Sequence, residues 1–117
     1  MDRRSVFFPD VFVGILLLSV EISWSRSVKD RRSVVKSILD RVRARWDVSA
    51  IDLGPDGILN RAFLGFSSVA PSSYMAVERL DAVRGFVESM QNAGEFDILE
   101  YRSEEHTSEL QSRFGIS

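Results

Sequence analysis

Lysine and arginine side chains are the residues whose types and spacing best suit a chemical role in this sequence. Residues 26–45 contain eight of them against two aspartates, a local balance of +6 within a chain of net charge −2. Six of these cations are placed to contact the phosphate groups of a nucleic acid: Arg26, Lys29, Arg31, Arg32, Lys36 and Arg43. The alternative is a solvated face with local ion pairs, such as Lys36 with Asp40. The uncompensated charge leaves both interpretations open.

Groups suited to catalysis or metal binding do not form a recognisable set. The sequence has no cysteine, which excludes disulfides, thiolate metal sites and cysteine nucleophiles, and its one histidine is His106. Carboxylates such as Glu21, Asp47 and Asp52 are scattered, without a partner base or a ligand set. The glycines match neither G-x-x-x-x-G-K nor G-x-G-x-x-G. We therefore expect a protein that is not an enzyme and needs no cofactor or metal.

An amphipathic helix over residues 26–46 must position the cations. Ser27 and Asp30 give a helix start signal, in which a hydroxyl accepts from an early backbone N–H and a carboxylate follows three residues later. Apolar residues recur at helical spacing and predict a buried stripe: Val28, Val35, Ile38, Leu39, Val42 and Trp46. Lys29, Arg32, Lys36 and Arg43 recur on a different side, so we expect them to face water.

The apolar run Val11–Ile22 is predicted to be a buried central strand. It is too short for a membrane span, which needs roughly 20 residues. Its alternation places Leu16, Leu18 and Val20 on the face toward the helices. A signal peptide, with the basic residues 3–4 before the run and small residues after it, is the alternative interpretation.

The remaining patterns complete the order β-α-β-β-α-β. Strands are predicted at 48–53, 62–69 and 96–101, with a turn at 54–57. A second helix begins near Pro71 and runs to about residue 92, and its expected buried stripe is Val77, Leu80, Val83, Val87 and Met90. This order predicts an α+β, ferredoxin-like fold: a four-stranded antiparallel sheet with two helices on one face.

The two ends of the chain have the composition of segments outside the domain. Residues 1–10 are predicted to be a loose lead-in, and 11–101 the ferredoxin-like domain. Residues 102–112, RSEEHTSELQS, are polar without apolar periodicity, and the whole string resembles the conceptual translation of a common sequencing adapter. We therefore expect residues 102–117 to be an artefactual or disordered tail.

The sheet face away from the helices is predicted to be apolar and uncovered. Ile15, Leu17 and Phe63 would lie on it, which favours self-association as a homodimer through this face or through the edge strand. The segment 61–66 also has a weak similarity to the aromatic strand of RNA-recognition motifs. Because Phe63 and Phe66 are three residues apart, they should point to opposite faces, so only Phe63 is placed to stack on a base.

Three segments together resemble the bacterial YlxP-like family, the domain of unknown function 503. Residues 25–32 (SRSVKDRR) are similar to its S-R-S-L-K-E-K-R signature, residues 43–49 (RARWDVS) to R-x-R-F-N-V-S, and residues 61–65 (RAFLG) to R-A-x-L-G. The resemblance covers residues 11–101. Departures are Trp24, where the family favours a small residue, Asp52 in place of its usual Glu, and Leu59 where it tends to have Trp.

The resemblance implies a ferredoxin-like fold in the bacterial cytoplasm. Genes of this family tend to lie near those for transcription elongation, translation initiation and ribosome maturation factors, which suggests a role linked to RNA or the ribosome. We therefore predict a non-enzymatic domain that binds RNA or the small ribosomal subunit through its basic first helix. The alternatives are a homo-oligomeric interaction module using the open sheet face and a small-molecule regulatory domain. We expect no membrane partner.

Overall fold

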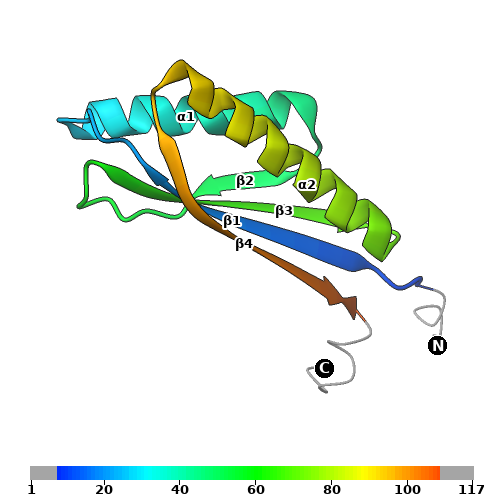
Figure 1. Cartoon of the computed structure of the whole chain (residues 1–117). Helices are drawn as coiled ribbons and strands as arrows, with labels where there is room; N and C mark the ends of the chain where they lie inside the picture. The colour runs from blue at the N-terminus through cyan, green and yellow to red at the C-terminus, as the bar shows by residue number, and fades with distance from the viewer. Residues whose placement is uncertain (1–7, 109–117) are drawn as a thin grey trace.

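Two α-helices pack on one face of a four-stranded antiparallel sheet (Figure 1). The computed structural model describes residues 8–108. The elements are β1 (Phe12–Glu21), α1 (Val28–Arg45), β2 (Ser49–Asp52), β3 (Arg61–Ala70), α2 (Ser73–Met90), a 3₁₀ turn η2 (Gln91–Ala93) and β4 (Asp97–Thr107). The strand order is β2-β3-β1-β4. Together, the element order and the strand order confirm the predicted ferredoxin-like α+β fold.

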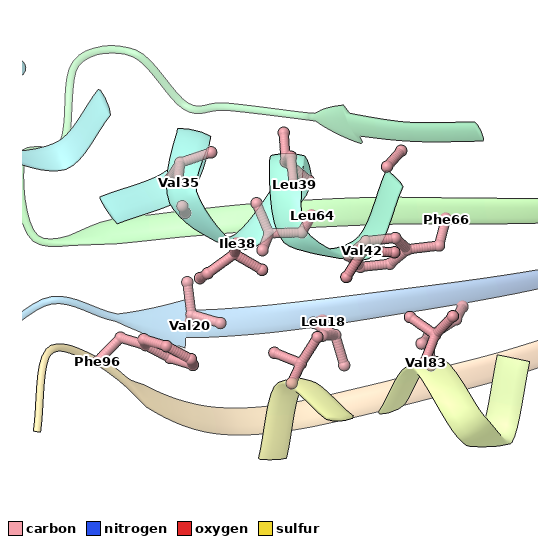
Figure 2. Packing of buried hydrophobic residues seen from close by; sticks show 14 of the residues in the cluster. Leu18, Val20, Val35, Ile38, Leu39, Val42, Leu64, Phe66, Val83 and Phe96 are labelled. Carbon is pink, nitrogen blue, oxygen red and sulfur yellow. The ribbon is translucent and has the colours of Figure 1, made fainter. Parts of the chain in front are cut away.

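The core forms where both helices cover the inner face of β1 and β3. Leu16, Leu18 and Val20 of β1 are at most 1% exposed, as their alternation predicts. Figure 2 shows side chains of β1, β3, α1 and α2 meeting in this layer, among them Leu18, Ile38, Val42, Leu64 and Val83. Phe66 is 2% exposed and Phe63 is 43% exposed, which confirms that the two phenylalanines occupy opposite faces of β3.

The helix stripes differ from the prediction at their edges. Val28 is 42% exposed and Val34 is buried, and on α2 Val77 is 44% exposed while Ala76 is buried. The cause on α2 is the close approach to β1. A Cβ built on Gly14 would lie 2.7 Å from Leu80 Cδ1 and 3.2 Å from the Ala76 carbonyl oxygen, so the glycine lets α2 approach β1 closely enough to bury Ala76.

β4 continues past the predicted end of the last strand. Residues 102–107 pair with β1, from Leu17↔Arg102 to Phe12↔Thr107, so this part of the expected artefactual or disordered tail is an ordered strand. Pairing at a sheet edge uses backbone N–H and C=O groups, so it does not require apolar side chains. Residues 1–7 of the expected lead-in and 109–117 of the expected tail lie outside the described residues. Between residues 8 and 108, neither helix combines the length and apolar character needed to cross a bilayer.

The start of α1 is fixed by the predicted pair of residues. The Ser27 hydroxyl accepts from the Asp30 backbone N–H at 3.0 Å, and the Asp30 carboxylate accepts from the Arg26 backbone N–H at 3.0 Å. This reciprocal arrangement satisfies N–H groups that a helix start otherwise leaves unpaired. It also orders the residues immediately before α1, including Arg26.

Candidate nucleic-acid interface

The six predicted phosphate-binding cations lie in two environments. Five have exposed side chains: Arg26, Lys29, Arg32, Lys36 and Arg43. Arg31 is only 2% exposed and ranks among the largest fully buried side chains. One of the six cations is therefore inside the protein and five are on its surface. We call these five the α1 cation row (Arg26, Lys29, Arg32, Lys36 and Arg43).

Arg31 holds the fold together rather than facing a ligand. Its guanidinium donates to both carboxylate oxygens of Asp52, at 2.8 and 3.0 Å, and its Nε donates to the backbone oxygen of Arg61 at 2.9 Å. This is the bidentate geometry in which arginine binds a carboxylate most strongly. The prediction that Arg31 contacts phosphate is wrong, because its guanidinium is enclosed and bound to these internal acceptors.

Asp52 joins α1 to the connection between β2 and β3. Besides Arg31, its carboxylate accepts from the backbone N–H of Gly54 at 2.8 Å. The hydrogen bond from Arg31 contributes most to holding the pKa of Asp52 below its ordinary value. The hydrogen bond from Gly54 and the nearby charge of Arg32 lower this pKa further. The hydrogen bond with Asp52 also raises the pKa of Arg31. The N-terminal half of α1 is thus bound to a fixed corner of the sheet.

The C-terminal part of the α1 cation row is partly neutralised. Asp40 accepts from Lys36 at 2.6 Å and lies 3.4 Å from Arg43. Arg43 also donates to the backbone oxygen of Ala50 in β2. The local ion pair between Lys36 and Asp40 is therefore present as the sequence suggests. Lys36 nevertheless remains accessible, since its side chain is 78% exposed.

The N-terminal part of the α1 cation row has no such compensation. Within residues 8–108, the side chains of Arg26, Lys29 and Arg32 form no ion pair. A shallow hollow on the outer side of α1 lies among the cations and is lined by Val28, Lys29, Arg32, Ser33 and Lys36. This part of the surface offers free positive charge around a concave spot.

The ion pairs of α2 form within that helix. On α2, Arg84 lies 3.9 Å from Asp81 and 3.0 Å from Glu88, and its guanidinium stacks on the ring of Tyr101 at 4.4 Å. In the part of the chain that is described, no ion pair joins a cation of α1 to a carboxylate of α2 or β4. The positive surface of α1 is therefore not cancelled across the fold.

The open face of the sheet carries apolar side chains, as predicted. Phe63 is exposed, and Ile15 and Leu17 are half-buried. The structure adds three residues that the sequence analysis missed, Ile51 (55% exposed), Leu53 (52%) and Val69 (66%). Leu53 packs over Gly65, where a Cβ would lie 3.0 Å from its Cδ1. The period-two alternation within β2 and β3 is the signal that identifies Ile51 and Val69.

Within residues 8–108, no group of three or more histidine, aspartate or glutamate side chains is placed to hold a metal ion. The perturbed pKa values belong to groups in ion pairs or hydrogen bonds, Arg31 with Asp52, Asp40 with Lys36, and Tyr74 with Glu78.

Comparison with known proteins decides the family. The model of the family described as "Protein of unknown function (DUF503)" matches residues 13–102. This chain belongs to that family. A DUF503 relative, the uncharacterized protein YlxP of Bacillus subtilis (strain 168), is 32% identical over 63 residues, which are 54% of this chain and 68% of that protein.

One solved structure has a partial likeness to the fold. It is a crystal structure of a C-terminal segment of the alpha subunit of aIF2 from Pyrococcus abyssi, with a TM-score of 0.45 and 21% identity. The match covers 81% of this DUF503 chain and 52% of that chain, so our protein spans about half of its length.

The Arg31–Asp52 ion pair yields a prediction for stability. Asp52→Asn should lower the free energy of unfolding by about 2–3 kcal/mol at pH 7, because it leaves a buried guanidinium without its counter-charge. The folded pKa of Asp52 lies below the unfolded value of 3.8. Its stabilisation is therefore complete above that pH and is lost as the pH falls through the folded pKa. The measurement is urea unfolding at pH values from 7 to 3. The difference in the free energy of unfolding between the wild type and the variant should become smaller below about pH 4.

The matched control is Asp40→Asn, which removes an aspartate from an exposed ion pair on the same helix. Because solvent screens that pair, Asp40→Asn should change the free energy of unfolding much less than Asp52→Asn does at pH 7. Equal destabilisation by the two variants would contradict the structural role assigned to Asp52.

Proposed function

We propose that this protein is a non-enzymatic RNA-binding domain of the bacterial cytoplasm that holds the phosphate backbone on the α1 cation row. One observation carries the proposal. Arg31 is buried, with its guanidinium hydrogen-bonded to Asp52. Arg26, Lys29 and Arg32, in contrast, are exposed and have no carboxylate partner in the described part of the chain. Surfaces of this kind bind polyanions by releasing their condensed counterions.

The spacing of the cations suits a backbone. Lys29 and Lys36 are seven residues apart, which is about 10 Å along a helix axis, and Arg43 lies about 21 Å from Lys29. A row of this length spans several phosphates of one strand. Lysine and arginine contacts to phosphate fix position and register but carry no base sequence. We therefore expect binding with low sequence specificity and strong salt dependence.

Like-charge repulsion within α1 favours a ligand over a purely solvated face. Lys29 and Arg32 are three residues apart, and Arg32 and Lys36 are four apart, so each pair lies adjacent on the helix surface. Such pairs destabilise a helix by about 0.2–0.5 kcal/mol each. A bound phosphate chain would remove this cost, whereas water and salt only screen it.

Neutralising three cations tests the proposal. The triple variant Lys29→Gln, Arg32→Gln and Lys36→Gln should weaken RNA binding and lower the slope of log affinity against log salt by about 2–3, because each lost phosphate contact contributes nearly one. The measurement is filter binding to an RNA oligomer across a salt series, together with co-sedimentation with small ribosomal subunits.

A matched control separates local charge from net charge. The variant Ala82→Glu, Asn92→Asp and Ala93→Glu lowers the net charge by the same amount but places the anions on exposed positions of α2 and η2. It should bind RNA nearly as the wild type does. If both triple variants behave alike, or if the wild type shows a flat salt dependence, α1 is not a phosphate-binding surface.

The open sheet face supports a second candidate function, self-association with another copy of this chain. The supporting observation is the group of exposed apolar side chains on β2 and β3, where Ile51, Phe63 and Val69 are 43–66% exposed beside half-buried residues of β1. Contiguous apolar surface on a folded domain usually marks an interface. Such a face can pair with its own copy about a twofold axis, because the same patch serves both partners.

A charge on this face tests self-association. Leu17→Glu and Phe63→Lys should each convert a dimer to a monomer in sedimentation equilibrium, because an interface core excludes unpaired charge. Tyr74→Lys, at a 72% exposed aromatic residue of α2, is the control and should leave the oligomeric state unchanged. A wild-type protein that stays monomeric at high concentration would rule out this candidate.

A further inference from the structure

Trp24 is an exposed aromatic side chain that is hydrogen-bonded to the fold and lies two residues before Arg26, the first residue of the α1 cation row. It lies in the connection between β1 and α1 (Figure 1). Its indole Nε1 donates to the backbone oxygen of Glu95 at 2.9 Å, on the segment that leads into β4. The side chain nevertheless remains 44% exposed. One edge of the ring is therefore anchored while much of its surface stays open to solvent.

The backbone around Trp24 is ordered by its own contacts. The Ser25 N–H donates to the Ile22 oxygen at 3.0 Å, and the Ile22 N–H donates to the Asn60 oxygen at 2.8 Å. Ser25 is 5% exposed, and its hydroxyl donates to the Ser27 oxygen at 3.2 Å. Hydrogen bonds thus fix the turn on both sides of Trp24, so a ligand that contacts the indole would not have to pay for ordering it.

An anchored indole beside free cations is the combination that binds single-stranded nucleic acid. Unpaired bases stack on aromatic rings while basic side chains hold the backbone, and stacking tolerates any base because every base has a π-face. In a duplex the bases are already stacked and paired, so their faces cannot reach an indole. A base stacked on Trp24 would therefore distinguish single-stranded RNA from a duplex.

We infer that the DUF503 chain binds single-stranded RNA, with a base stacked on Trp24 and the adjoining phosphates on Arg26 and Lys29. This inference rests on the proposed phosphate contact by α1 and names the form of RNA that it takes. Glu95, whose backbone oxygen accepts from the Trp24 indole, leads into β4 and has an exposed side chain whose negative charge repels phosphate. The RNA backbone therefore runs from Trp24 toward α1, over Arg26, and not toward β4.

Intrinsic fluorescence tests the stacking directly. The sequence has two tryptophans, and the second, Trp46, packs edge-on against Phe86 with ring centroids 5.3 Å apart. Trp46→Phe leaves Trp24 as the only reporter. Titration with a single-stranded RNA oligomer should quench its emission, and a duplex of the same length should quench it far less. Trp24→Ala should weaken binding of the single strand by about 5- to 100-fold and binding of the duplex by less than about twofold.

Two further variants keep the test interpretable. Trp24→Phe keeps an aromatic face but loses the Nε1 donor, so it should retain more affinity for single strands than Trp24→Ala does. Tyr74→Ala, at an exposed aromatic residue of α2, should change neither affinity. Thermal unfolding of each variant checks that the fold is intact.

The failure of this inference differs from the failure of the proposed function. Unquenched Trp24 emission, or equal affinity of Trp24→Ala and the wild type for single strands, would overturn the stacking. A loss of affinity on neutralising α1 would still support phosphate binding in that case. If the wild type bound neither single-stranded nor duplex RNA at low salt, both proposals would be overturned.

Discussion

The buried ion pair between Arg31 and Asp52 determines which side of α1 faces water. It fastens the first half of the helix to the corner where β2 ends and β3 begins, and the backbone oxygen of Arg61 completes the contact. Successive residues of a helix are separated by a fixed rotation. Once Arg31 points inward, the neighbouring Lys29, Arg32 and Lys36 must point outward. The same interaction that stabilises the fold therefore creates its positive surface.

The ion pairs of Asp40 form within α1 and those of Arg84 form within α2, so the charges of the two helices do not cancel each other. Arg84 pairs with two carboxylates of α2, and Asp40 pairs with Lys36 in the middle of α1 and with Arg43 near its end. Within residues 8–108, the cations without an ion pair lie at the start of α1, where Asp30 is already engaged with the Arg26 backbone. This is also where the turn carrying Trp24 enters the helix. The exposed cation Arg26 and the anchored ring of Trp24 thus lie within the same connection, between β1 and α1.

Local patterns predicted the parts of the fold that local interactions determine. Alternation in β1 placed its core residues, and the separation of Phe63 from Phe66 placed one outside and one inside. The buried position of Arg31 was also readable, since it lies four residues before Val35 and seven before Ile38. Its partner could not be found in this way, because Asp52 lies 21 residues later on another element. The extension of β4 depends on backbone pairing with β1, and the burial of Ala76 depends on Gly14, so neither follows from spacing along the chain.

The most direct test of the account is the map of backbone amide shifts on titrating the isotope-labelled protein with single-stranded RNA at low and at moderate salt. If RNA binds at Trp24 and the α1 cation row, the amide shifts that change should lie mostly between Trp24 and Lys36 and not in β2 or β3. These shift changes should become smaller as the salt concentration rises. Changes centred on Phe63 and Ile51, or an absence of change at low salt, would contradict it.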